Sequence, residues 1–209
     1  MPKVVDRAEK REEVLEATWR LMARVGIDRV SIRKIAAEAG CSTGVIAHYF
    51  KNKEDVLLSA LRLVNRQEIE RVASSTAGLR GLAAVRSAIE EVLPVGKDRK
   101  LEMTIWMSYW GRAVGDARLA TFQRRSYGAW RSLLRGHFEE AVADAEVPSD
   151  LDCTDEAART AALVDGLAIQ ALLEPERMTP VKVVEIMDSH LRSLAVAARH
   201  SAQLAARPV

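Results

Sequence analysis

Apolar residues recur at intervals of three and four along most of the chain, and this spacing restricts the fold more than any other feature. One such stripe lies within residues 7–25, where six apolar residues form a face if the segment is helical: Val14, Ala17, Trp19, Leu21, Met22 and Val25. No convincing run of alternating apolar and polar residues predicts a β-strand. We therefore expect an all-α protein, with helices over residues 7–25, 31–39, 42–49, 52–73, 79–93, 99–114, 117–145, 154–173 and 181–202.

Residues that begin and end helices divide this series into two parts. Gly26 and Gly40 each follow an apolar helix and suit the position just after a helix. Three side chains are suited to cap the N-terminal ends of the helices that follow, namely Ser31, Ser42 and Asn52. We predict a three-helix unit in residues 1–53 and a larger helical bundle in residues 54–209.

Charge is distributed unevenly between these two parts. Residues 1–53 contain eleven Lys and Arg and seven Asp and Glu, a net charge of +4, whereas the whole chain carries +2. The remaining 156 residues therefore carry −2. A basic front end on a mildly acidic body favours an anionic partner at the front. Ordinary surface charge is the alternative, because the excess is small.

The sequence argues against several classes of protein. Cys41 and Cys153 stand outside any CxxC or Cys/His spacing, so we expect no disulfide framework and no metal site, and a cytoplasmic location. No apolar run approaches the ~20 residues of a membrane span, and the N-terminus has no signal-peptide core. Without a glycine-rich phosphate loop, an HExxH motif or a GxSxG motif, we expect neither an enzyme nor a cofactor.

The segment 31–50 has the pattern of a helix, a tight turn and a second helix. Gly40 gives the turn its backbone freedom, and we expect Cys41 to point inward as a small apolar residue. Ile46 and Phe50 lie four residues apart, so both can face the core. The other positions of the second helix then face outward or lie at its edges: Thr43, Gly44, Val45, Ala47, His48 and Tyr49.

This outward face suits the major groove of DNA. Small residues at the N-terminal end of the helix permit close approach to base edges, as a recognition helix requires. Thr43 can hydrogen-bond to a base, and Val45 can touch a thymine methyl group. Tyr49 and Lys53 can contact phosphates, the latter beside the free N–H groups of the next helix, and Arg33 can reach guanine or the backbone. The alternative is that these helices only pack together.

The stretch "SIRKIAAEAGCSTGVIAHYFKNKEDVL" resembles the signature of TetR-type repressors, and the resemblance covers residues 12–58. Its "GVIAHYF" form is most similar to the BetI branch, repressors of choline-to-betaine genes. Cys41 departs from the family pattern, which usually has valine there. The resemblance implies a cytoplasmic homodimer that represses transcription and that a small ligand releases from DNA. It also implies that DNA is contacted by Ser31, Arg33, Thr43, Gly44, Val45, His48, Tyr49 and Lys53.

Such a repressor must hold two recognition helices one DNA turn apart, ~34–36 Å, on a palindromic operator. The expected dimer interface is the segment of about residues 154–202, because "AARTAALVDGLAIQALL" is rich in Ala and Leu and contains Gly166. Two such helices from each protomer form a four-helix interface. The alternative is that this face packs only within its own subunit.

Aromatic residues make up only 5% of the chain, yet several gather in two neighbouring segments of the body. Asp165 interrupts an apolar helix, and a buried carboxylate needs a partner such as an arginine or a ligand cation unless it is exposed. Aromatic faces beside a carboxylate suit an amine or a quaternary ammonium ion. The predicted ligand site, for which a plain bundle core is the alternative, contains Glu102, Met103, Trp106, Met107, Trp110, Phe122, Tyr127 and Asp165.

The function that these expectations describe is a ligand-responsive repressor that is released by a small-molecule inducer, with a cationic amine as the expected class. A ligand-independent or activating DNA-binding regulator on the same fold is the alternative function.

Overall fold

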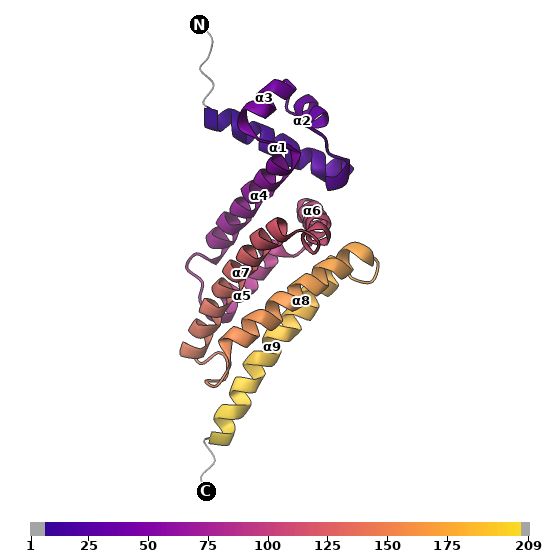
Figure 1. Cartoon of the computed structure of the whole chain (residues 1–209). Helices are drawn as coiled ribbons and strands as arrows, with labels where there is room; N and C mark the ends of the chain where they lie inside the picture. Colours follow the sequence, from indigo (N-terminus) through magenta and orange to yellow (C-terminus); the bar gives the residue numbers. More distant parts are fainter. Residues whose placement is uncertain (1–6, 206–209) are drawn as a thin grey trace. The chain divides into compact units, whose positions relative to one another are not determined.

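A computed structural model describes residues 7–205 of the chain, with side chains described through Ala195 (Figure 1). The described residues form α-helices joined by turns and contain no strand, so the predicted all-α class is confirmed. Residues 1–6 and 206–209, which the predicted domains include, lie outside the described residues. No helix among the described residues is long and apolar enough to span a membrane.

The first of two compact units comprises the residues up to Gln67 together with Thr104–Ala120. Three helices, α4, α6 and α7, have residues in both units. The helices that lie wholly or partly in the first unit are α1 (Arg7–Val25), the 3-10 helix η1 (Ile27–Arg29), α2 (Ile32–Glu38), α3 (Thr43–Tyr49), α4 (Lys53–Thr76), α6 (Lys97–Ala113) and α7 (Ala117–Ala143).

The apolar stripes of α1, α2 and α3 meet in the core of the first unit. Val14 and Met22 of α1 and Ile35 of α2 are almost completely buried. Ile46 lies in α3 and Phe50 directly follows it, and their exposed fractions are only 1% and 4%. Each buried side chain of this size contributes about 1.5–3 kcal/mol to folding. These two side chains therefore fix which face of α3 points outward.

The predicted helix ends are largely confirmed. Gly26 and Gly40 have positive φ angles, +81° and +60°, which a glycine adopts readily. The predicted caps accept backbone hydrogen bonds from residues three positions later: Ser31 from Lys34, Ser42 from Val45, and Asn52 from Asp55, at 3.4, 3.3 and 2.9 Å.

Several details differ from the prediction. The turn η1 was not expected. Helix α4 continues to Thr76, because the hydroxyls of Ser74 and Thr76 donate to carbonyls one turn earlier and so tolerate the helical conformation. Helix α8 begins at Cys153, because Asp152 caps it by accepting from the N–H groups of the two residues after Cys153. Cys41 is only half-buried, not fully inward as expected.

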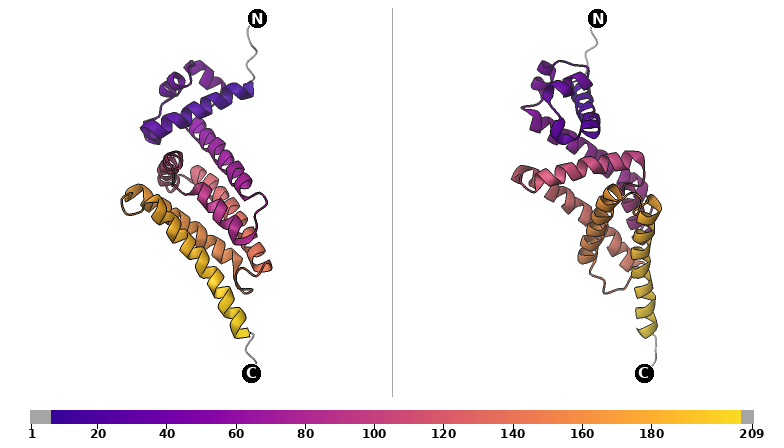
Figure 2. Two further views of the ribbon diagram at one scale, coloured as in Figure 1. Left: turned by 180° about the vertical axis from the view of Figure 1, so that it is seen from behind. Right: turned by 90° about the vertical axis from the view of Figure 1, so that its right-hand side faces the viewer.

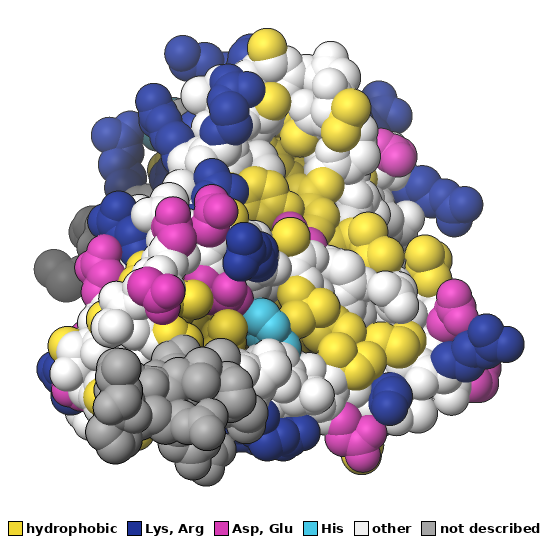
Figure 3. All heavy atoms as spheres, turned by 90° about the horizontal axis from the view of Figure 1, so that it is seen from below, with side chains coloured by type: hydrophobic (Ala, Val, Ile, Leu, Met, Phe, Trp, Pro, Cys, Tyr) yellow, Lys and Arg dark blue, Asp and Glu magenta, His cyan; other side chains and the backbone are white. Residues whose placement is uncertain are grey.

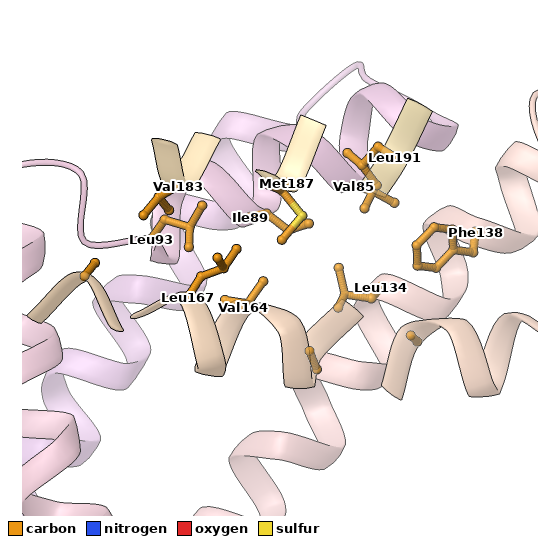
Figure 4. Packing of buried hydrophobic residues seen from close by; sticks show 13 residues of the cluster. Val85, Ile89, Leu93, Leu134, Phe138, Val164, Leu167, Val183, Met187 and Leu191 are labelled. Atoms are coloured by element: carbon orange, nitrogen blue, oxygen red, sulfur yellow. The ribbon is translucent and has the colours of Figure 1, made fainter. Parts of the chain in front are cut away.

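The second unit comprises Glu68–Met103 and Thr121–Val209 and is built on α5 (Gly81–Val92), most of α7, α8 (Cys153–Leu173) and α9 (Pro180–Ala205). Helices α8 and α9 lie side by side (Figure 2). Its apolar core draws side chains at helical spacing from all four helices (Figure 4): Val85, Ile89, Leu93, Leu134, Phe138, Val164, Leu167, Val183, Met187 and Leu191.

Candidate functional site

The outward face of α3 consists of small and polar side chains. Thr43, Gly44 and His48 are exposed, and Val45 and Tyr49 lie half-buried at the edges. This is the orientation that the spacing of the apolar residues predicted, because the opposite side of the helix is anchored in the core. The face therefore offers a shallow N-terminal end and a polar C-terminal end to an outside partner.

Gly44 is not required by the fold of the chain itself. Its φ angle lies outside the positive range that favours glycine, and an added Cβ would meet only the Ser42 hydroxyl, at an ordinary 3.5 Å. Alanine would also favour the helix by about 1 kcal/mol. Gly44 therefore lowers helix stability without relieving any crowding inside the chain. A glycine here does allow the surface of a partner to approach α3 closely.

Helix α2 presents two of the predicted residues. Arg33 is exposed, and among the described residues its guanidinium makes neither a hydrogen bond nor an ion pair. Ser31 instead has an internal role, since its hydroxyl caps α2. Arg33 is therefore available to an outside anion, and the Ser31 hydroxyl, which accepts in its capping bond, can still donate its O–H to a phosphate.

The start of α4 holds Lys53 half-exposed, 3.9 Å from the carboxylate of Glu54. Its neighbours already occupy part of the helix end: Asn52 accepts the Asp55 N–H, and Asp55 accepts the Lys51 N–H at 2.9 Å. The carboxylates of the first turn also offset the positive end of the helix dipole. The Lys53 ammonium, rather than the bare helix terminus, is thus the feature here that suits a phosphate.

Sequence reasoning missed two arginines of α1 that contact the end of α3. The Arg7 guanidinium nitrogen Nη2 lies 2.6 Å from His48 Nε2, and the Arg11 guanidinium lies over the Phe50 ring, 5.1 Å from its centre. Arg11 also donates to the Ser59 hydroxyl at 3.4 Å. No sequence signal links residues about 40 positions apart, so only the fold reveals these contacts.

The aromatic residues predicted for the ligand site are divided between the two units. Trp106, Met107 and Trp110 belong to the first unit, where Trp106 is buried and packs edge-on against Tyr109, at 5.9 Å between ring centres. The Tyr109 hydroxyl donates to the Leu119 carbonyl at 2.6 Å, and burial raises its pKa to about 12. This part of the set has the character of a packed core.

Glu102, in the second unit, already has two cationic partners. Its carboxylate lies 2.8 Å from Arg71 and 3.3 Å from Arg99, and both arginines also approach Glu91. These four side chains form a half-buried network that joins α4, α5 and α6. The charge of Glu102 is therefore balanced within the chain.

Asp165 is the predicted carboxylate that has no direct ion pair among the described residues. The Tyr127 hydroxyl donates to its Oδ2 at 2.7 Å. Burial raises the pKa of Asp165, although the hydrogen bond from Tyr127 and the charge of Arg131 act in the opposite direction. Arg131 also lies near the Tyr127 ring, 5.8 Å from its centre. A half-buried carboxylate held by a neutral donor can attract a further cation.

The other predicted ligand residues of the second unit are Met103, which is buried, and Phe122, which is half-buried. The structure thus brings Tyr127 and Asp165 into direct contact. Within the described residues, no group of three or more His, Cys, Asp or Glu side chains is arranged to hold a metal ion.

Comparison with known proteins gives two family matches. Residues 14–60 match the family described as bacterial regulatory proteins of the tetR family. Residues 81–196, more than half of the chain, match the C-terminal domain of the BetI-type transcriptional repressor. The chain belongs to the TetR family of transcriptional regulators. The predicted resemblance, including its BetI character, is therefore confirmed, and a member of this family is a regulator and not an enzyme.

Relatives resemble this TetR-family chain along most of its length. The HTH-type transcriptional regulator PksA of Bacillus subtilis is 29% identical over 198 residues, covering 94% of this chain and 95% of PksA. The HTH-type transcriptional regulator BetI 1 of Chromohalobacter salexigens is 30% identical over 181 residues, covering 84% and 85%.

Among solved structures, a transcriptional regulator from Saccharomonospora viridis in complex with choline superposes with a TM-score of 0.81. It is 26% identical, and the match covers 88% of this chain and 96% of that one. A TetR regulator from Haloarcula marismortui has the same TM-score at 16% identity, covering 90% and 98%, which shows the fold alone.

Proposed function

We propose that this TetR-family regulator is a cytoplasmic homodimeric repressor that binds a palindromic operator through α3 and is released by a small cationic ligand. The observation that carries the DNA-binding part is the outward face of α3, whose shallow end includes a glycine that the fold does not need. Family membership makes the chain a DNA-binding regulator. The operator, the dimer interface and the inducer are the proposed parts.

The predicted DNA contacts sort into two roles. Arg33, Thr43 and Val45, with the close approach that Gly44 allows, would read base edges in the major groove. Tyr49 and Lys53 would hold phosphates and so fix the register of the helix without reading sequence. His48 stands at the C-terminal end of the reading face. Ser31 accepts in its capping bond and keeps its O–H to donate to a phosphate.

For the dimer we propose the face of α8 and α9. Hydrophobic side chains reach the surface of the molecule between charged ones (Figure 3). On α8 an exposed stripe at helical spacing consists of Ala158, Ala162, Ile169 and Leu173, and the last of these is 77% exposed. Val181 of α9 is 68% exposed. A second copy of the chain would remove this apolar stripe from water. Side chains 196–202 of the predicted interface lie outside the described ones.

For the ligand we propose a site around Asp165 and Tyr127 in the second unit. The Asp165 carboxylate is half-buried and has no ion pair at contact distance among the described residues. A cationic group would therefore offset the free-energy cost of its desolvation. The structural relative that holds choline supports the same ligand class, an amine or quaternary ammonium compound. Glu102 contributes less to this proposal, because two arginines already balance it.

Selection of bound sequences from random DNA tests the operator. We expect an inverted repeat whose half-sites are centred about one helical turn apart, ~10 base pairs, or a multiple of that distance. Affinity for the selected site should fall steeply with salt, since phosphate contacts release counterions. Enrichment of no sequence, or of a single unrepeated half-site, would contradict the proposed dimeric operator complex.

A thermal-shift panel of amines, quaternary ammonium compounds and neutral hydrophobic molecules tests the ligand. We expect cations to stabilise the wild type and to release it from the selected operator, and Asp165→Asn to lose both effects. Asp155→Asn is a matched control, because it removes an exposed carboxylate from the same helix. Stabilisation by neutral molecules alone would refute the cationic class. Operator affinity that no molecule changes would indicate a ligand-independent regulator.

A further inference from the structure

The contact between Arg7 and His48 assigns a proton within the proposed reading face. An arginine side chain has five N–H donors and no acceptor, and it stays charged in proteins. At 2.6 Å from Arg7, the His48 Nε2 atom must therefore accept a hydrogen bond. A ring that accepts at Nε2 is neutral and carries its proton on Nδ1.

The surroundings of the imidazole leave this Nδ1–H group available. His48 is exposed, and its ring meets the edge of Tyr49 at 5.0 Å between centres. Among the described residues, Nδ1 has no hydrogen-bond partner. Arg7 and Arg11 lie four residues apart on α1, so one face of that helix contacts both His48 and Phe50 at the end of α3. The His48 ring itself is contacted by Arg7 and by the ring of Tyr49.

We propose that Arg7 is a positioning residue for sequence recognition: it holds His48 as the Nδ1–H tautomer, so that His48 offers a donor, and no acceptor, to a base edge. This rests on the proposed DNA contact by α3. In the major groove, guanine O6 and N7, adenine N7 and thymine O4 accept hydrogen bonds, whereas cytosine presents only a donor. His48 in this state therefore disfavours cytosine at the base it reads.

Loss of Arg7 frees the ring to take either tautomer. With the proton on Nε2 and an unprotonated Nδ1 facing the groove, His48 would accept from the N4 group of cytosine or the N6 group of adenine. Arg7→Ala should therefore broaden the preference at one operator position to include cytosine, and not merely lower affinity at all sites.

The first test needs no DNA. Long-range proton–nitrogen NMR correlations of the full chain report which imidazole nitrogen carries the proton, and His48→Asn identifies the signal. We expect the Nδ1–H pattern in the wild type and in Arg20→Ala, a control that removes an exposed arginine of α1 with only long ion pairs. Arg7→Ala should shift the pattern toward Nε2–H. An Nε2–H tautomer or a doubly protonated ring in the wild type overturns the proposal.

The second test is a double-mutant cycle on the selected operator. If Arg7 acts through His48, Arg7→Ala should weaken binding by about tenfold in the wild type, the value of one good hydrogen bond, and by little in a His48→Ala background. An equal loss in both backgrounds, with a smaller salt dependence, would make Arg7 a direct phosphate contact and refute the positioning role. If no DNA sequence is selected at all, the proposed function fails, while the tautomer result still stands.

Discussion

Replacing Tyr127 by phenylalanine removes one oxygen atom and leaves Asp165 without its hydroxyl donor. That bond is 2.7 Å long and has a carboxylate as acceptor. Hydrogen bonds to charged groups contribute ~1.5–3 kcal/mol. Because Asp165 is only half-buried and also feels the charge of Arg131, we expect a loss of about 1–1.5 kcal/mol in the free energy of unfolding at pH 7.

The loss should depend on pH. Burial raises the pKa of Asp165 in the folded state, so its contribution to stability is full below the unfolded pKa and is lost as the pH rises through the folded pKa. The Tyr127 hydrogen bond lowers that folded pKa, and its removal raises it further. Tyr127→Phe should therefore be more destabilising at pH 7 than in acid, where Asp165 is a neutral acceptor and the lost hydrogen bond contributes only about 0.5–1 kcal/mol.

Urea unfolding followed by tryptophan fluorescence measures both values. Tyr109→Phe is the control, because its hydroxyl donates to a neutral carbonyl, and its cost of ~1 kcal/mol should change little with pH. A Tyr127→Phe cost near zero, or one that is the same at pH 7 and in acid, would contradict the idea that the hydroxyl stabilises a half-buried carboxylate.

Two further substitutions test the packing that presents these sites. Ile46→Ala should destabilise the protein by about 2–4 kcal/mol and weaken operator binding in parallel, because Ile46 anchors α3 in the core. The control Ala47→Ser, on the exposed side of α3, should change stability by less than about 0.5 kcal/mol in thermal or urea unfolding. Glu102→Gln should cost about 1–2 kcal/mol, between the values of exposed and buried ion pairs, because it removes the charge that balances Arg71 and Arg99. The exposed Glu139→Gln is its control in the same unfolding assay, and an equal effect of both would contradict the network's role.

The orientation of α3 could be predicted from the sequence because it depends on local spacing. Ile46 and Phe50 are four residues apart, and the caps Ser31, Ser42 and Asn52 act on N–H groups three residues away. Interactions of this range are set by helical geometry alone.

Contacts between distant segments could not be predicted in the same way. The pairing of Arg7 with His48 and of Arg71 with Glu102 joins residues 41 and 31 positions apart, and any of many arginines was an equal candidate. Asp165 illustrates the limit. Its position in an apolar helix indicated that the carboxylate needs a partner, but the direct partner is a tyrosine hydroxyl rather than an arginine.

In the proposed complex, the exposed face of α3 reads the sequence of an operator while its flanks hold phosphates. Base preferences of Thr43→Ala and Lys53→Ala, measured on the selected operator and all its single-base variants, test it most directly. We expect Thr43→Ala to relax the preference at one position of each half-site by ~1–3 kcal/mol, and Lys53→Ala to weaken all sites about equally and reduce the salt dependence. Unchanged base preferences in Thr43→Ala, or unchanged affinity in Lys53→Ala at moderate salt, would contradict this assignment of roles.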